Sequence, residues 1–235
     1  MTLLGRVSAI ALVLAVPQSA LAAITVFSSE AALAPNDTVD WSQFGVAGTD
    51  VALPAGWTST GGATGTVDGS AGPLERLDQG SQWFGNFAPG DALLYQGGST
   101  GAGNADPSDS IVLTFNGGVI GLGLQFQSDA IGAFDVTVNV FDVTATLMDS
   151  FIVTGASANT GDNSAVFWGV RSDGAMIGSV SAVNRITNAD NKAFAINRLR
   201  LITDVPADVP EPAALSLFGL GLAGLGALRR RGSRG

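Results

Sequence analysis

The sequence predicts an all-β fold, an antiparallel β-sandwich, for the central part of the chain. Apolar and polar residues alternate with period two over 119–127 and 134–140, as they do in strands with one buried face. Turn-forming residues separate such segments at intervals of about ten residues, which is typical of sandwiches. No stretch of 23–208 has the length and period of a substantial helix. The best-defined strands are therefore expected within 110–203.

The first part of this region has weaker strand signals. A strand is expected at 24–28, followed by a short segment at 30–33, and a second strand at 39–44 around a tryptophan. Residues 52–72 are rich in Gly, Thr and Ala, which favours a long loop or weak edge strands. Residues 74–110 mix aromatic residues with Gly, Asn and Pro, and this composition indicates loops.

The second part predicts a regular series of strands. A strand at 111–115 is followed by a tight turn at 116–118 and by a second strand at 119–127. Further strands are expected at 134–140, 147–154, 165–170, 176–183 and 194–202. Because side chains alternate between the two faces of a strand, the alternating apolar residues of each segment should lie on its buried face. The predicted core residues are Ile120, Leu122, Leu124, Phe126, Val136 and Val138.

Residues 1–22 have the features of a secretory signal peptide. Arg6 is their only charge, residues 7–16 form an apolar core, and Ala20 and Ala22 supply the small residues of a cleavage site. An N-terminal transmembrane anchor is the alternative, but the apolar core is short for that role. We expect export by the Sec machinery and cleavage after Ala22, which leaves an ectodomain at 23–208.

Residues 209–235 combine three features in a fixed order. Pro210-Glu211-Pro212 comes first, then an uncharged run at 213–228, then Arg229-Arg230-Arg231. The prolines favour an extended stub, and the run predicts a transmembrane helix of about 24 Å, somewhat short of a bilayer core. The arginines should lie on the cytoplasmic side. A plain tail anchor is the alternative, although an anchor does not need the tripeptide.

This arrangement resembles the PEP-CTERM sorting signal. Pro210, Glu211 and Pro212 match its tripeptide, 213–228 matches its short apolar helix, and Arg229, Arg230 and Arg231 match its basic end. The resemblance implies recognition by an exosortase-type membrane enzyme in a diderm bacterium that produces exopolysaccharide. It also implies an inner-membrane intermediate whose tail is removed, followed by a location at the cell surface or in the extracellular matrix.

Residues 110–203 are similar to the β-sandwich, jelly-roll-like domain that often precedes such tails. The matching stretches are 111–115, 119–124, 166–173 and 194–199. The family commonly has Asp-Asn in the last motif, where this chain has Asn197-Arg198. If that aspartate binds a cation elsewhere in the family, the substitution removes a charged ligand here.

The charge and composition of the ectodomain limit its partners and chemistry. Residues 23–209 hold 19 acidic and six basic residues, a net charge of −13 compared with −9 for the whole chain. Such a surface argues against nucleic acid and anionic lipid as partners, and suits neutral glycans or divalent cations. The chain has no cysteine and no histidine, so disulfides, the usual zinc sites and the commonest general base are unavailable. We therefore expect no enzymatic activity.

Two motif matches are rejected as cofactor or catalytic sites. Residues 97–101 fit the G-x-S-x-G nucleophile elbow, but they lie in a glycine-rich loop and the chain offers no histidine base. Residues 219–224 fit G-x-G-x-x-G, but they lie inside the apolar run, where small residues permit close helix packing.

Carboxylates in loops are the candidate metal ligands. If a loop binds a structural calcium ion, the expected ligands are Asp106 and Asp109, since hard cations prefer oxygen. Asp162 and Asp190 lie in other loops, and ordinary solvated side chains are the favoured interpretation of all four. No other cofactor is expected. A glycosidase would need two facing carboxyl groups, and nothing in the sequence selects such a pair.

The leading hypothesis is an exported, non-enzymatic surface or matrix protein with a structural or adhesive role and exopolysaccharide as its candidate partner. A carbohydrate-binding module is the alternative, with Trp83, Phe84 or Trp168 stacking on sugar rings. A hydrolase that uses carboxylates alone is a third hypothesis. The aromatic residues near 83–95 are interpreted first as a hydrophobic lid over the core. Exposure distinguishes these hypotheses, because a buried tryptophan cannot stack on a ligand.

Overall fold

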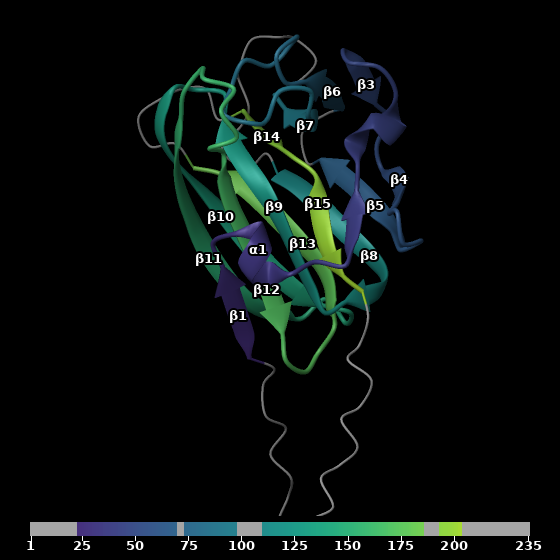
Figure 1. Ribbon diagram of the computed structural model, residues 1–235. Helices are drawn as coiled ribbons and strands as arrows, with labels where there is room; N and C mark the ends of the chain where they lie inside the picture. Colours follow the sequence, from purple (N-terminus) through teal and green to yellow (C-terminus); the bar gives the residue numbers. More distant parts are fainter. Residues whose placement is uncertain (1–22, 70–72, 98–109, 186–192, 204–235) are drawn as a thin grey trace, which may run out of the picture.

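The computed structural model describes residues 23–69, 73–97, 110–185 and 193–203. These residues form two antiparallel sheets that pack face to face (Figure 1), so the predicted all-β sandwich is confirmed. Helical structure within the described ranges is limited to one turn each of α1 (Glu30–Leu33) and the 3-10 helix η1 (Trp41–Phe44).

In the described residues, one sheet has nine strands and the other has six. The main path of the nine-stranded sheet is β1 (Ile24–Phe27), β12 (Val166–Ser172), β9 (Gly121–Ser128), β14 (Phe194–Ile196), β7 (Ala92–Gln96), β6 (Leu74–Asp78) and β3 (Thr49–Val51). Its other two strands, β15 (Leu199–Ile202) and β2 (Asp37–Val39), pair with each other, and β15 also pairs with β9. The six-stranded sheet has the order β11 (Leu147–Ser157), β10 (Gly132–Asp142), β13 (Ile177–Asn184), β8 (Ser110–Val119), β5 (Thr64–Gly69) and β4 (Ala55–Thr58).

The core lies between the two sheets, and its central strands have the predicted alternation. The buried side chains of β9 and β10 are at most 2% exposed at Leu122, Leu124, Phe126, Val136 and Val138. Ile120 is also buried, at 8% exposed, but it packs in a smaller cluster with Leu33 of α1 and Ile202 of β15. The predicted core is confirmed, and Ile120 belongs to a cluster separate from the main core.

The chain crosses from one sheet to the other between β8 and β9, so the tight turn expected at 116–118 is wrong. β8 continues through these residues, and its register with β13 shifts so that 115–118 bulge out of the ladder. Gly117 and Gly118 have φ values of +80° and +79°, which residues with a side chain rarely adopt. The two adjacent glycines therefore form part of a bulge here, although such a pair is also typical of a hairpin turn.

Residues 41–44 form η1, so the strand expected at 39–44 is wrong over most of its length. Asp40 caps the turn, because its Oδ1 accepts a hydrogen bond of 2.9 Å from the Ser42 backbone N–H. Trp41 is fully buried in the main core. The apolar residues that suggested a strand are therefore explained by one buried helical turn.

Short strands occur in both segments with weak strand signals. In 52–72, β4 and β5 form an antiparallel pair at one edge of the six-stranded sheet, which confirms the second alternative. In 74–110, the prediction of loops alone is wrong, because β6 pairs with β7 and β7 with β14. Charged residues concealed β6: Arg76 is buried, and its guanidinium is bonded to Asp78.

The strand expected at 194–202 is divided into β14 and β15. β14 pairs with the end of β9 and with β7, whereas β15 pairs with the beginning of β9 and with β2. The sheet therefore forks at Asn197 and Arg198. β1 begins and β15 ends at the same end of the sandwich, the lower end in Figure 1. The connections β6–β7, β9–β10 and β11–β12 lie at the opposite end, which we call the loop end.

Candidate functional site

Several predicted functional residues lie outside the described residues. They comprise the cleavage-site residues Ala20 and Ala22, the loop acids Asp106, Asp109 and Asp190, residues 98–101 of the rejected motif at 97–101, the whole motif at 219–224, and the C-terminal residues Pro210, Glu211, Pro212, Arg229, Arg230 and Arg231. No helix within the described ranges is long and apolar enough to cross a membrane, and the helix predicted at 213–228 lies outside them. The three aromatic candidates and Asp162 are described.

Trp83 and Trp168 are buried, so neither can stack on an external sugar, and this role is wrong for both. Trp83 is 6% exposed, and its ring centroid is 5.4 Å from that of Tyr95. Trp83 belongs to a hydrophobic cluster that is separate from the main core, which is the arrangement expected of a hydrophobic lid. Trp168 is 4% exposed and lies in the main core, with its ring centroid 5.7 Å from that of Phe151. The alternation of β12 directs this ring inward, between the sheets.

Phe84 is 61% exposed and lines a cleft at the loop end of the sandwich. The cleft has a volume of about 240 Å³ and is formed by the connections β6–β7, β9–β10 and β11–β12. Besides Phe84, its lining includes Gln82, Asp129, Ile131 and Asn159. Ile131 is 71% exposed, so the rim carries two large apolar side chains beside amide and carboxylate groups. An aromatic face next to polar side chains is the combination that binds sugars in water.

Two buried side-chain amides, Gln127 and Asn86, join the end of β9 to the β6–β7 and β11–β12 connections at this cleft. Gln127 Oε1 accepts hydrogen bonds from Trp83 Nε1 at 3.1 Å and from the Asn86 backbone N–H at 2.6 Å. Gln127 Nε2 donates to Asn86 Oδ1 at 2.9 Å and to the Ala158 carbonyl at 3.2 Å. Asn86 Nδ2 in turn donates to Thr160 Oγ1 at 2.8 Å. The floor of the cleft is thus fixed by a network with satisfied donors and acceptors.

Asp162 belongs to this network and is engaged by neighbouring donors. The Ser164 hydroxyl donates to Asp162 Oδ1 at 2.5 Å, and Asn86 Nδ2 donates to the same atom at 3.3 Å. The hydrogen bond from Ser164 is the main reason that the pKa of Asp162 falls to about 2. A glycine is needed at position 85, because a Cβ there would lie only 2.1 Å from Gln127 Oε1 and would clash with the network. Sequence reasoning missed Asn86 and Gln127, although the alternation of β9 does place Gln127 away from the main core.

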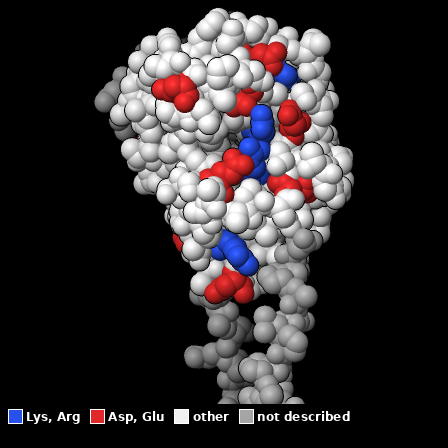
Figure 2. Space-filling model, in the orientation of Figure 1, with Lys and Arg blue, Asp and Glu red and all other residues white. Residues whose placement is uncertain are grey.

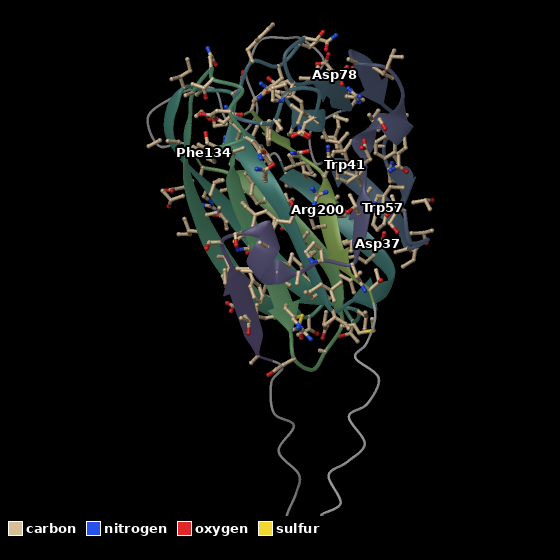
Figure 3. The ribbon with its side chains drawn as sticks, in the orientation of Figure 1. Asp37, Trp41, Trp57, Asp78, Phe134 and Arg200 are labelled. Atoms are coloured by element: carbon tan, nitrogen blue, oxygen red, sulfur yellow. The ribbon has the colours of Figure 1, made fainter. Side chains whose placement is uncertain are left out.

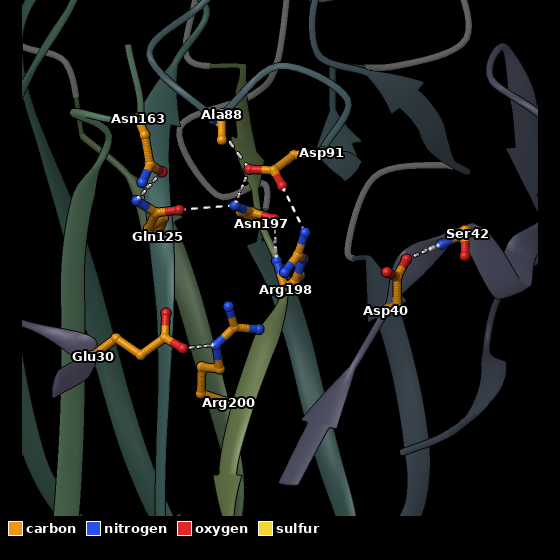
Figure 4. A network of polar contacts seen from close by, with 10 residues as sticks. All are labelled: Glu30, Asp40, Ser42, Ala88, Asp91, Gln125, Asn163, Asn197, Arg198 and Arg200. Carbon is orange, nitrogen blue, oxygen red and sulfur yellow. Dashed lines mark hydrogen bonds and ion pairs between the residues drawn. The ribbon is translucent and has the colours of Figure 1, made fainter. Parts of the chain in front are cut away.

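A second polar cluster lies on the outer face of the nine-stranded sheet, where β14 and β15 diverge (Figure 4). Asn197 Nδ2 donates to Asp91 Oδ2 at 2.6 Å and to Gln125 Oε1 at 2.8 Å. Arg198 forms an ion pair of 3.1 Å with Asp91 Oδ1. Next to this cluster, Arg200 Nε pairs with Glu30 of α1 at 2.5 Å. Basic side chains form a short line across the middle of this face, with acidic side chains beside them (Figure 2).

Asn197 and Arg198, which stand where the similar domains commonly have Asp-Asn, therefore have a structural role in this chain. The Asn197 amide donates to Asp91 rather than offering a carboxylate, and Arg198 supplies the positive charge beside Asp91. Within the described ranges, no three His, Cys, Asp or Glu side chains form a group that could hold a metal ion.

A third polar cluster joins the two sheets at Asp37 (Figure 3). Asp37 on β2 is 5% exposed and accepts hydrogen bonds from Ser59 and Thr60 and from the Gly61 backbone N–H. All three donors lie in the connection between β4 and β5. Burial by itself would raise the pKa of Asp37, but these hydrogen bonds and one from the Thr38 N–H lower it overall.

Comparison with known proteins gives one family match. The family model for the PEP-CTERM protein-sorting motif matches residues 208–231. Among solved structures, the chain resembles CsCBM6-3 from Clostridium stercorarium in complex with cellobiose, at 9% identity and a TM-score of 0.31, over 58% of this chain and 87% of that one. No curated protein sequence matches. The match at 208–231 confirms the sorting signal and implies an exported protein that an exosortase processes and that is sorted to the cell surface.

Proposed function

We propose that the mature protein is a non-enzymatic component of the cell surface or the exopolysaccharide matrix, with a structural or adhesive role. The observation that carries this proposal is the position of the sorting motif relative to the fold. β15 ends at Ile202, at the end of the sandwich where β1 also begins (Figure 1), and the motif follows in the sequence from residue 208. This end therefore faces the membrane during sorting, and the loop end with Phe84 faces outward.

Two observations support a role without catalysis. The chain has no histidine or cysteine, which removes the commonest general base and the thiol nucleophile. Among the described residues, the buried carboxylates of Asp37 and Asp91 are held by several donors, so they act as structural groups. The surface charge and the outward loop end suit contact with neutral matrix components.

The sorting step is tested with Glu211→Gln in a host that carries an exosortase. We expect the wild type to lose its tail, whereas the variant accumulates as a longer precursor in the inner membrane. Glu211 precedes the apolar run, so insertion of that run into the membrane does not depend on its charge. Recognition of the tripeptide by the exosortase should depend on it, because Glu211 is the middle residue of the tripeptide. Cell fractionation and intact-mass measurement report both outcomes.

The matched control is Glu75→Gln, the same chemical change within the ectodomain. Burial and, to a smaller extent, the nearby negative charge of Asp50 raise the pKa of Glu75, so removing its charge relieves an unfavourable environment. This variant should be processed like the wild type. Full-length, membrane-bound protein for both the wild type and Glu211→Gln would mean that the tail is a plain anchor, contrary to the proposal.

Binding of neutral glycans is a second candidate function, and the exposed Phe84 in the loop-end cleft favours it. Stacking of a sugar on this ring would use the apolar face of the ligand, while Gln82 and Asn159 can bond its hydroxyl groups. The carboxylate of Asp129 in the same cleft favours a neutral glycan over an anionic one.

Phe84→Ala tests this function in binding measurements with the purified exopolysaccharide of the host and with neutral oligosaccharides. Loss of an aromatic contact worth about 1.4 kcal/mol should weaken binding about tenfold, and Phe84→Tyr should retain it. Val46→Ala is the control, because Val46 is 78% exposed and does not line the cleft. Equal binding by Phe84→Ala and the wild type would exclude this cleft as the glycan site.

A further inference from the structure

Within the part of the chain that the structure describes, no strand pairs with the outer edge of β11. β11 (Leu147–Ser157) has eleven residues and is the last strand of the six-stranded sheet. Among the described residues, its only strand partner is β10. A strand of this length spans about 37 Å and presents a row of backbone N–H and C=O groups on its free side. Such an edge is a template for pairing with another strand.

β11 has few of the features that usually protect an edge. It contains no lysine, arginine or proline, and its single charged residue is Asp149. One backbone donor is engaged locally, since the Ser150 N–H donates to Asp149 Oδ1 at 2.8 Å. Exposed apolar side chains gather here instead: Ile152 is 72% exposed, Leu147 is 53% exposed, and Val143 in the preceding turn is 58% exposed.

The sequence of β11 is complementary to itself in the antiparallel orientation. Ile152 is its middle residue, so a two-fold axis at this position pairs residues 149–155 with the same residues of the copy, clear of the register shift that β11 has between Leu147 and Asp149. In that register Ile152 faces the same residue of the copy, Ser150 faces Thr154, and Asp149 faces Gly155. Apolar side chains meet, hydroxyl groups meet, and no like charges are opposite each other.

We propose that β11 pairs with β11 of a second copy of this chain, which joins the six-stranded sheets of two molecules into one continuous sheet. The other edge strand of that sheet, β4, has only four residues and cannot match eleven. The assembly is therefore a closed dimer rather than a filament. Pairing replaces the local bond of the Ser150 N–H with one to a carbonyl of the copy.

The antiparallel orientation has a consequence for adhesion. β11 runs from the membrane-facing end toward the loop end (Figure 1), so its copy is inverted. The sorting ends of the two molecules then point in opposite directions. Such a dimer connects copies on two facing surfaces, or released copies within a matrix, rather than neighbours held in one membrane. This inference goes beyond the proposed function by naming the partner, and its test does not depend on sorting.

Sedimentation of the exported mature protein tests the pairing, with Ile152→Lys as the variant. The wild type should be a dimer, and the two like charges that face each other across the paired edges in the variant should weaken association at least tenfold. Val46→Lys is the matched control, because Val46 is 78% exposed but lies between η1 and β3, outside the six-stranded sheet. Circular dichroism should be the same for all three, which shows that both variants fold like the wild type. A monomeric wild type, or equal weakening by both variants, would overturn the proposal.

Cysteine cross-linking tests the register, because the chain has no native cysteine. Paired residues in an antiparallel ladder have Cβ atoms about 5.5 Å apart, within reach of a short cross-linker. Ile152→Cys should give a covalent dimer on its own. Ser150→Cys and Thr154→Cys should cross-link mainly when the two variants are mixed. Cross-linking of Ile152→Cys no faster than Val46→Cys would contradict the two-fold register.

Discussion

Asp37 illustrates how one carboxylate can join two sheets. It lies on β2, while its hydroxyl and amide donors lie between β4 and β5 of the other sheet. We expect Asp37→Asn to lower the free energy of unfolding by about 1.5–3 kcal/mol at pH 7, because a buried charged acceptor loses its charge while its donors remain. Urea denaturation of the ectodomain measures this change.

The pH dependence of the Asp37 effect follows from the lowered pKa. A carboxyl whose pKa is lower in the folded state adds stability above its unfolded pKa of about 3.9, and this stability is lost as the pH falls through the folded pKa. The difference between the wild type and Asp37→Asn should therefore shrink below about pH 4. Asp68→Asn is the control, since Asp68 is exposed and its side chain accepts a hydrogen bond from the backbone N–H of the neighbouring Gly69. Equal losses in both variants would contradict the role of Asp37.

At the scale of elements, β9 is the strand on which the nine-stranded sheet depends. It pairs with β12 along one side, and with β14 and β15 along the other. Leu124 lies in the middle of β9, is 2% exposed, and faces the other sheet. We expect Leu124→Ala to lower the free energy of unfolding by about 2–5 kcal/mol, from lost burial plus a cavity.

Denaturant unfolding followed by fluorescence measures the Leu124→Ala effect. Val46→Ala serves as its control, because Val46 is 78% exposed and a surface substitution of this kind changes stability by less than about 0.5 kcal/mol. A loss below about 1 kcal/mol for Leu124→Ala would mean that this part of the core is loosely packed.

At the scale of the whole molecule, three functions are assigned to three different surfaces. The lower end in Figure 1 carries the connection to the sorting motif, the loop end carries the Phe84 cleft, and one side carries the β11 edge. Because these surfaces are separate, Glu211→Gln should change sorting alone, Phe84→Ala glycan binding alone, and Ile152→Lys association alone. A single variant that changed all three would indicate a loss of folding.

The sequence alone determined the fold class, the inner face of β9 and β10, and the sorting signal. Each of these depends on neighbouring residues: period-two alternation gives the strands, and the order of tripeptide, apolar run and arginines gives the signal. Phe84 also stands as a candidate from the sequence, and its exposure in the cleft is compatible with that role.

Only the tertiary structure decided which strands share a sheet and what each polar or aromatic side chain contacts. Asn197 and Asp91 are 106 positions apart, and Arg200 and Glu30 are 170 apart, so no local pattern predicts their pairing. Trp83 has aromatic and glycine neighbours in sequence that suit an exposed loop, yet it is buried by Tyr95 from another strand. Burial depends on which distant segments pack together, and the topology of the chain determines that packing. The type and spacing of neighbouring residues do not specify the topology.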